Sequence, residues 1–248
     1  SRTKATRPPT TTTSTLPSTT TTPPPPTTTT APPPPGPPPR NLVAYTGLGT
    51  WVDVYDFAPE FQASGAPPPI TPASVDTMAA QGIKTIFLQA SKDDVRSPPG
   101  DIVHPELVGA FVTKAHAKGI RVVAWFLPKL ADVGADARRL GSLHDFRAEG
   151  QRFDGIGVDI EWRKDVPDAG ERNARLIDLS RRIRAYAPEE ALGAIVMPPV
   201  VTEVINPAFW PGFPWRELAP SYDVWLPMGY WTNRTGESGW RDAHRYTD

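Results

Sequence analysis

Short apolar runs alternate with amphipathic segments along residues 41–248. Apolar runs of about four to eight residues between turn residues are typical of buried strands, and longer segments with a period near 3.6 are typical of helices. The pattern predicts strands within 42–55 and at 83–88, 120–127, 155–162, 192–197 and 223–231. It predicts helices at 71–82, 104–118, 136–146 and 168–186, a helical turn at 215–218 and the beginning of a helix at 240–246.

This alternation predicts a parallel sheet with crossover helices. Two α/β architectures compete. Six strands satisfy an open doubly wound sheet, whereas a (β/α)8 TIM-type barrel usually needs about 250 residues and eight strands. The polar positions on the strands favour the barrel, truncated after its sixth strand. We therefore expect two more strands within about 50–70 residues beyond Asp248, and unpaired edges on the first and sixth strands.

The first 40 residues differ in composition from the rest: 14 are Pro, 15 are Thr, and none is acidic. Such a segment buries too little apolar surface to offset its ordering entropy. It predicts a disordered Pro/Thr-rich linker over 1–40 before an incomplete barrel domain over 41–248. The linker is either an O-glycosylated stalk or a plain spacer. Because the chain begins with Ser1 and not Met, we expect an upstream targeting segment and an extracellular or cell-surface location.

Charge and composition exclude several classes of function. The tail carries four of the 26 basic residues, so residues 41–248 hold 22 basic and 27 acidic groups, a net charge of −5. This balance argues against a nucleic-acid partner. No apolar run reaches the roughly 18 residues of a membrane span. The chain has no Cys, which excludes disulfides and thiol chemistry.

The segment 154–162, Asp-Gly-Ile-Gly-Val-Asp-Ile-Glu-Trp, carries the main chemical signal. Side chains alternate along a strand, so Asp159 and Glu161 share one face with Cα atoms about 6.5–7 Å apart, and Gly157 leaves room beneath them. Close like charges raise the pKa of one carboxyl group. A protonated acid at the carboxyl end of a barrel strand is what cleavage of a glycosidic bond needs. A surface pair bonded to the following Arg-Lys is the alternative, but the apolar opposite face disfavours it.

These residues resemble the strand-four motif of the family 18 glycoside hydrolases, the chitinase family, D-G-x-D-x-D-x-E. The positions that match are Asp154, Gly155, Asp159 and Glu161, while Gly157 stands where the family has its second Asp. The family also has Met-x-Tyr on its sixth strand, and this chain has Met228-Gly229-Tyr230 on the predicted sixth strand. The Asp-x-Glu is also similar to the family 25 lysozymes, although nothing on the first strand supports that likeness.

The resemblance implies a retaining, substrate-assisted hydrolysis of an N-acetylated glycan. Glu161 would protonate the glycosidic oxygen and later activate water, and Asp159 would orient the attacking 2-acetamido group. Tyr230 would donate a hydrogen bond to the acetamido oxygen, and Met228 and Asp154 belong to the same motifs. No metal or organic cofactor is implied. The Gly at 157 predicts a different substrate, slower chemistry, or a barrel that binds sugar without cleaving it.

Other candidate residues follow from strand position. Trp162 and Trp231 are candidate platforms for sugar rings, although the parity of Trp231 also fits packing beneath a helix. Gln89 is a candidate sugar contact. Asp53 is either a turn residue or part of the site. The remaining tryptophans are either assigned to the core or not placed (Trp51, Trp125, Trp210, Trp215, Trp225 and Trp240).

The four histidines lack metal-ligand spacing, so no metal site is expected. The leading hypothesis is a secreted glycosidase acting on a chitin-like or peptidoglycan-like polysaccharide or oligosaccharide. The alternative is a non-catalytic, cell-surface carbohydrate-binding barrel. The sequence does not predict an oligomeric state.

Overall fold

A computed structural model of the chain describes residues 40–63 and 65–247. The predicted linker lies outside these residues, except for Arg40. The Arg40 guanidinium forms an ion pair with Asp223 at 2.9 Å and donates a hydrogen bond to the Pro188 carbonyl oxygen. Arg40 therefore contacts the folded unit.

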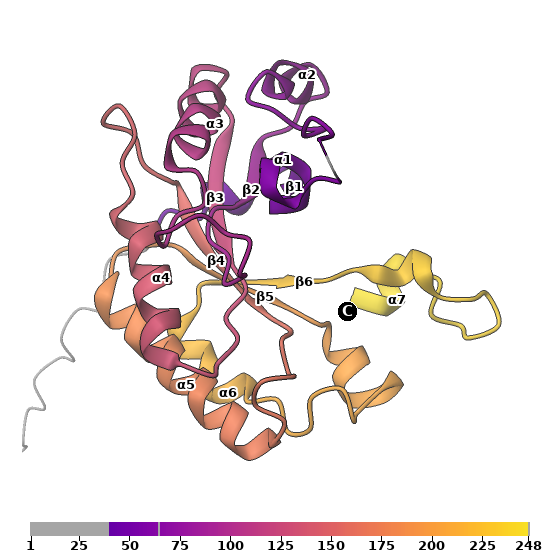
Figure 1. The fold of residues 1–248 in the computed structure, drawn as a ribbon. Coiled ribbons are helices and arrows are strands. Elements are labelled where there is room, and N and C mark those ends of the chain that lie inside the picture. The colour runs from indigo at the N-terminus through magenta and orange to yellow at the C-terminus, as the bar shows by residue number, and fades with distance from the viewer. Residues whose placement is uncertain (1–39, 64, 248) are drawn as a thin grey trace, which may run out of the picture. The chain divides into compact units, whose positions relative to one another are not determined.

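Six parallel strands form one curled sheet, with helices packed along its outer side (Figure 1). The strands are β1 (Gly49–Val52), β2 (Thr85–Gln89), β3 (Arg121–Phe126), β4 (Gly155–Ile160), β5 (Leu192–Val196) and β6 (Val224–Pro227). Their spatial order is their chain order. A doubly wound sheet reverses its strand order at a switch point, so the open-sheet alternative is wrong. The sheet is that of a partial barrel.

The longer helices follow the strands as predicted. They are α2 (Ser74–Ala80), α3 (Pro105–Ala117), α4 (Val133–Asp145) and α5 (Ala169–Tyr186). Shorter ones are α1 (Val54–Phe57), α6 (Trp215–Leu218) and α7 (Ala243–Thr247), with single turns η1 (Val43–Tyr45), η2 (Pro59–Phe61), η3 (Val201–Ile205), η4 (Ala219–Ser221) and η5 (Tyr230–Asn233).

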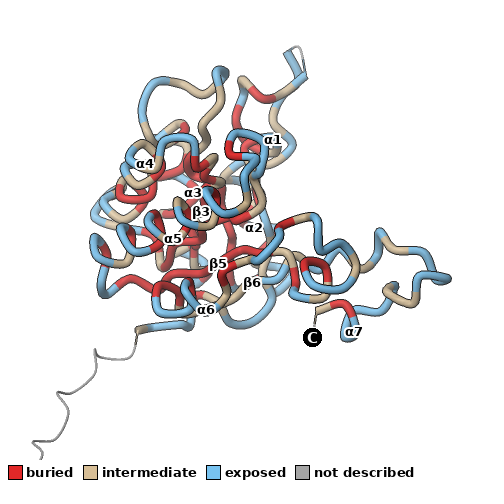
Figure 2. The backbone as a smooth tube through the Cα atoms, turned by 90° about the horizontal axis from the view of Figure 1, so that it is seen from below, coloured by how far each residue is buried: buried red, intermediate tan, exposed pale blue. Residues whose placement is uncertain are grey.

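Apolar side chains pack on both faces of the sheet. The larger cluster lies between strands and helices and includes Ile86, Val122 and Phe111, all fully buried. A smaller cluster lines the inner, concave face and includes Phe87 and Trp125. Strands β2 to β5 are buried along most of their length, whereas β6 is not (Figure 2). Among the described residues β6 pairs only with β5, and β1 only with β2, which explains their exposure.

Tyr45, from η1, closes the amino-terminal end of the concave face. Its hydroxyl donates to the carbonyl oxygens of Ile156 at 2.9 Å and Ala191 at 2.8 Å. Its ring lies against Gly155 and Gly193, where an added Cβ would come within 2.8 Å of Tyr45 atoms. Glycine at both positions makes room for the ring. Tyr45 therefore covers the concave face at the end opposite the carboxyl ends of the strands.

The loop from β3 to α4 is held by a buried carboxylate. Asp136 accepts the Leu130 amide hydrogen bond at 2.8 Å, and Leu130 adopts a left-handed backbone with φ of 63°. Burial raises the pKa of Asp136 to about 6, although the hydrogen bonds from the Leu130 and Lys129 amides lower that pKa. This loop carries Lys129, which lies near the site described below.

The Asp136→Asn variant tests this linkage. The folded protein binds the Asp136 proton more tightly than the unfolded chain does, so ionisation of Asp136 lowers stability as pH rises from about 4 through about 6. We expect the unfolding free energy of the parent, relative to the variant, to fall by on the order of 2–3 kcal/mol over that window. Urea unfolding at several pH values measures it. A difference that stays constant with pH would contradict the prediction.

Candidate active site

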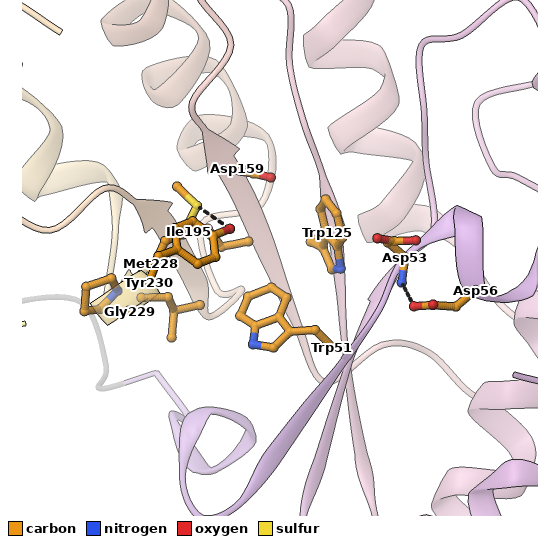
Figure 3. A pocket seen from close by; sticks show the side chains of 11 residues that line it. Trp51, Asp53, Asp56, Trp125, Asp159, Ile195, Met228, Gly229 and Tyr230 are labelled. Carbon is orange, nitrogen blue, oxygen red and sulfur yellow. Dashed lines mark hydrogen bonds between the residues drawn. The ribbon is translucent and has the colours of Figure 1, made fainter. Parts of the chain in front are cut away.

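A cleft of about 390 Å³ opens at the carboxyl ends of the strands, on the concave face (Figure 3). Parallel sheets place ligand sites at this end because the connecting loops gather there. Eleven residues line the cleft: Trp51, Asp53, Asp56, Trp125, Asp159, Ile195, Leu226, Pro227, Met228, Gly229 and Tyr230. The strands β1, β3, β4, β5 and β6 thus all contribute to one cavity.

Asp159 enters the cleft from β4, and Glu161 follows just beyond the end of that strand. Asp159 is only 7% exposed, and its Oδ1 is buried without a hydrogen-bond donor among the described residues. Burial raises the pKa of Asp159 well above its ordinary value, the charge of Glu161 raises it further, and Lys92 opposes both. Burial also raises the pKa of half-buried Glu161. Both carboxyl groups therefore hold a proton at higher pH than free side chains would.

Tyr230 lines the same cleft as Asp159 (Figure 3). Burial raises the pKa of its hydroxyl, and the charges of Glu161 and Asp159 raise it further. That hydroxyl lies 3.6 Å from the Met228 sulfur. The motifs on the fourth and sixth strands, about 70 residues apart in sequence, are thus within electrostatic range of each other.

The sixth strand is shorter than predicted. It ends at Pro227, and the chain then turns sharply, with the Tyr230 amide donating to the Met228 carbonyl oxygen at 2.9 Å. Tyr230 and Trp231 therefore belong to η5 and not to a strand. Strand parity does not apply to Trp231, and it is not among the residues that line the cleft.

The room expected beneath the acids at Gly157 is filled. A Cβ at this position would lie 3.0 Å from Ile195 Cδ1 and 3.1 Å from Trp125 Cβ. Both neighbours are apolar and buried. They occupy the place toward which an acid at 157 would point, so Asp159 has no carboxylate partner below it and contacts an apolar floor.

Two tryptophans, Trp51 and Trp125, form an aromatic wall of the cleft, which the sequence did not predict. Trp51 stacks on Phe87 with ring centroids 4.4 Å apart and meets Trp125 edge-on at 6.1 Å. Trp51 is nevertheless 47% exposed, so Phe87 covers part of it and another part faces the cleft (Figure 3). Strand alternation would have placed the Trp51 side chain on the concave face if the bounds of β1 had been known. The apolar pattern over 42–55 did not define those bounds.

Besides Glu161 and Trp231, three more predicted residues do not line the cleft. The Gln89 side chain is buried and accepts the Val54 amide hydrogen bond at 3.2 Å, which ties β2 to α1. Asp154 lies at the amino-terminal end of β4, where its carboxylate binds the His116 ring at 2.8 Å and the Val122 amide. Trp162 lines a separate, smaller recess next to the acids.

Asp53 lines the cleft and also has a structural role. It caps α1 by accepting the Tyr55 amide hydrogen bond at 2.7 Å, and Asp56 accepts from the Asp53 amide at 3.0 Å (Figure 3). Burial raises the pKa of Asp53, and the charge of Asp56 adds to that effect. Asp53 is thus both a turn residue at the start of α1 and a residue of the cleft, the two alternatives that the sequence left open.

Across the described ranges, no cluster of three or more His, Asp or Glu side chains is arranged to hold a metal ion. No helix among the residues that the structure describes has the length and apolarity needed to cross a bilayer.

Comparison with known proteins finds likeness in fold only. No model of a known protein family matches this chain, and no curated protein matches it. A GH18 chitinase from Cycas revoluta, solved in complex with (GlcNAc)4, is similar with a TM-score of 0.49 and 12% identity, over 73% of this chain and 54% of that one.

The chitinase domain of the spore coat protein CotE from Clostridium difficile has a TM-score of 0.43 and 13% identity, over 77% of this chain and 51% of that one. An α-amylase from Lactobacillus plantarum has a TM-score of 0.42 and 14% identity, over 79% of this chain and 57% of that one. This chain thus spans about half the length of these structures.

Proposed function

We propose that this protein is a glycoside hydrolase that cleaves an N-acetylated glycan, chitin-like or peptidoglycan-like, with retention of configuration. The observation that carries the proposal is that Asp159 and Tyr230 line one cleft, with the charge of Glu161 acting on both of them. The raised pKa of Glu161 supports a role as general acid near neutral pH. The aromatic wall supports a pyranose ligand, because the apolar face of a sugar packs against an aromatic ring.

In this mechanism, Glu161 donates its proton to the glycosidic oxygen while the bond from that oxygen to the anomeric carbon breaks. The 2-acetamido oxygen of the same sugar attacks the anomeric carbon and forms a cyclic cation. Asp159 accepts the acetamido N–H with its unpartnered Oδ1 and stabilises the positive charge. Water then attacks the anomeric carbon, transfers a proton to the Glu161 carboxylate and restores the acetamido group.

A second candidate function is a carbohydrate-binding barrel without turnover. The apolar surroundings of position 157 favour it, because no carboxyl group at that position helps Asp159 change its protonation state. The two candidates share the cleft and differ in whether Glu161 transfers a proton.

Product analysis distinguishes the two. We expect the protein to release reducing ends from N-acetylglucosamine oligomers or cell-wall glycan, with the β-anomer formed first in a nuclear magnetic resonance time course. Binding without release of reducing ends would support the second candidate. Release of the α-anomer first would contradict the retaining mechanism.

The aromatic wall supplies a prediction about binding. We expect Trp51→Ala to weaken glycan binding by roughly 5- to 30-fold, since the lost contact is worth roughly 1–2 kcal/mol. Calorimetric titration with an N-acetylglucosamine oligomer measures the effect.

The matched control is Trp240→Ala, which removes a partly buried indole that lies against Arg245 and does not line the cleft. Equal affinities of the parent and Trp51→Ala would show that Trp51 is not a sugar platform.

A further inference from the structure

A second, smaller recess of about 130 Å³ lies at the carboxyl ends of the first four strands. Its lining comes from the loops that follow those strands: Tyr55, Lys92, Asp93, Asp94, Leu127, Lys129 and Trp162. Trp162 follows Glu161 directly in the chain. Lys92, on the other side, acts electrostatically on Asp159 and Asp53 of the main cleft. The recess is therefore next to the proposed site of cleavage.

The acidic residues of the recess already have partners. Asp93 forms ion pairs with Lys129 at 3.1 Å and Arg139 at 3.2 Å. Asp94 forms an ion pair with Arg96 at 2.9 Å. These contacts neutralise both carboxylates, and Lys92 brings an additional positive charge.

The lysine ammonium groups also lie close to two aromatic rings of the recess. Lys129 lies 6.0 Å and Lys164 5.3 Å from the Trp162 ring, and Lys92 lies 5.0 Å from the Tyr55 ring. Ring faces of this kind hold ammonium groups in place without neutralising their charge. Because Arg139 also pairs with Asp93 and Arg96 pairs with Asp94, the two lysines leave the recess with excess positive charge for an anion.

We propose that this recess binds a carboxylate group carried by the glycan, on a sugar next to the one whose bond is cleaved. The proposal rests on the proposed function and narrows its substrate class to acidic N-acetylated glycans. The volume suits a carboxylate with a bridging water, since one water occupies about 30 Å³. Ammonium groups bind carboxylates by charge-assisted hydrogen bonds.

Paired oligomers of equal length test the proposal. One is a neutral N-acetylglucosamine tetramer. The other alternates N-acetylglucosamine with N-acetylmuramic acid, in which each lactyl group ends in a free carboxylate. We expect the parent to bind the acidic oligomer roughly tenfold more tightly at low ionic strength, and this preference to shrink at about 0.5 M salt, where the Debye length is only a few ångströms.

The variants Lys129→Met and Lys92→Met locate the effect. Each is expected to reduce the preference roughly fivefold, and Lys129→Met is expected to leave affinity for the neutral oligomer nearly unchanged. Lys129 is the cleaner position, because Lys92 also acts on Asp159. The matched control is Lys118→Met. In the parent, the Lys118 ammonium pairs with Asp76 at 3.0 Å, and Asp76 has a second cationic partner, as Asp93 does.

The outcomes are distinguishable. Equal affinity of the parent for both oligomers, or a preference that persists in both lysine variants, would overturn the recess proposal and leave the proposed function standing. Failure of the parent to bind either oligomer would overturn the proposed function, and the recess proposal with it.

Discussion

Replacement of Glu161 by Gln is expected to lower the rate of glycan cleavage by roughly a thousandfold, with little change in glycan affinity. The amide has nearly the shape of the carboxyl group but has no acidic proton to give to the leaving oxygen. Glu161 lies just beyond β4 beside buried Asp159, where burial raises its pKa and keeps it protonated nearer neutral pH. Release of reducing ends and calorimetric titration, run on the same preparation, measure the two quantities.

The matched control is Glu106→Gln, the same substitution in α3 at an exposed residue remote from the cleft. Its rate should equal that of the parent. Turnover by Glu161→Gln at the parental rate would mean that Glu161 is not the general acid. A fall in affinity as large as the fall in rate would instead give Glu161 a role in binding.

Replacement of Gly193 by Val should have the largest effect on stability. A Cβ at this position would lie 2.8 Å from the Tyr45 ring and 3.0 Å from Leu226 Cδ1. Tyr45 has little freedom to move, because its hydroxyl is bonded to two carbonyl oxygens of the sheet. We expect a loss of roughly 3 kcal/mol, or a fall in Tm of roughly 6–12 °C for a domain of this size.

Thermal and urea unfolding measure this loss. Gly236→Ala is the control, since no atom lies within 4 Å of its added Cβ. In a Tyr45→Ala background the cost of Gly193→Val should shrink, because the ring that the new side chain meets is gone. An unchanged cost in that background would show that the Tyr45 ring is not what restricts position 193.

The positions of the strands along the chain could be predicted because each parallel strand is a short apolar run bounded by turn residues. The predicted strand at 83–88 is observed at Thr85–Gln89, and that at 155–162 at Gly155–Ile160. The predicted helix 168–186 begins where a cap is observed: Asp168 accepts the Glu171 amide hydrogen bond, and the Glu171 carboxylate pairs with Arg175.

The position of Asp159 in the cleft was predictable because a motif and strand parity coincided there, and the catalytic roles of Asp159 and Glu161 stay predictions. The prediction was poorer where contacts between distant segments decide the role. Gln89 was predicted as a sugar contact, but its side chain accepts the Val54 amide hydrogen bond. Asp154 belongs to a sequence motif, but it lies one strand length from the cleft.

The sequence by itself determined the alternation of strands and helices and the inward side of Asp159 on β4. Those properties depend on local periodicity, and neighbours in sequence are enough to define them. The tertiary structure alone decided that Trp51 lines the cleft, that Trp125 and Ile195 fill the space at Gly157, and that Lys92 and Lys129 share a recess with Trp162. These contacts join strands many residues apart, and only the curvature and register of the sheet bring them together.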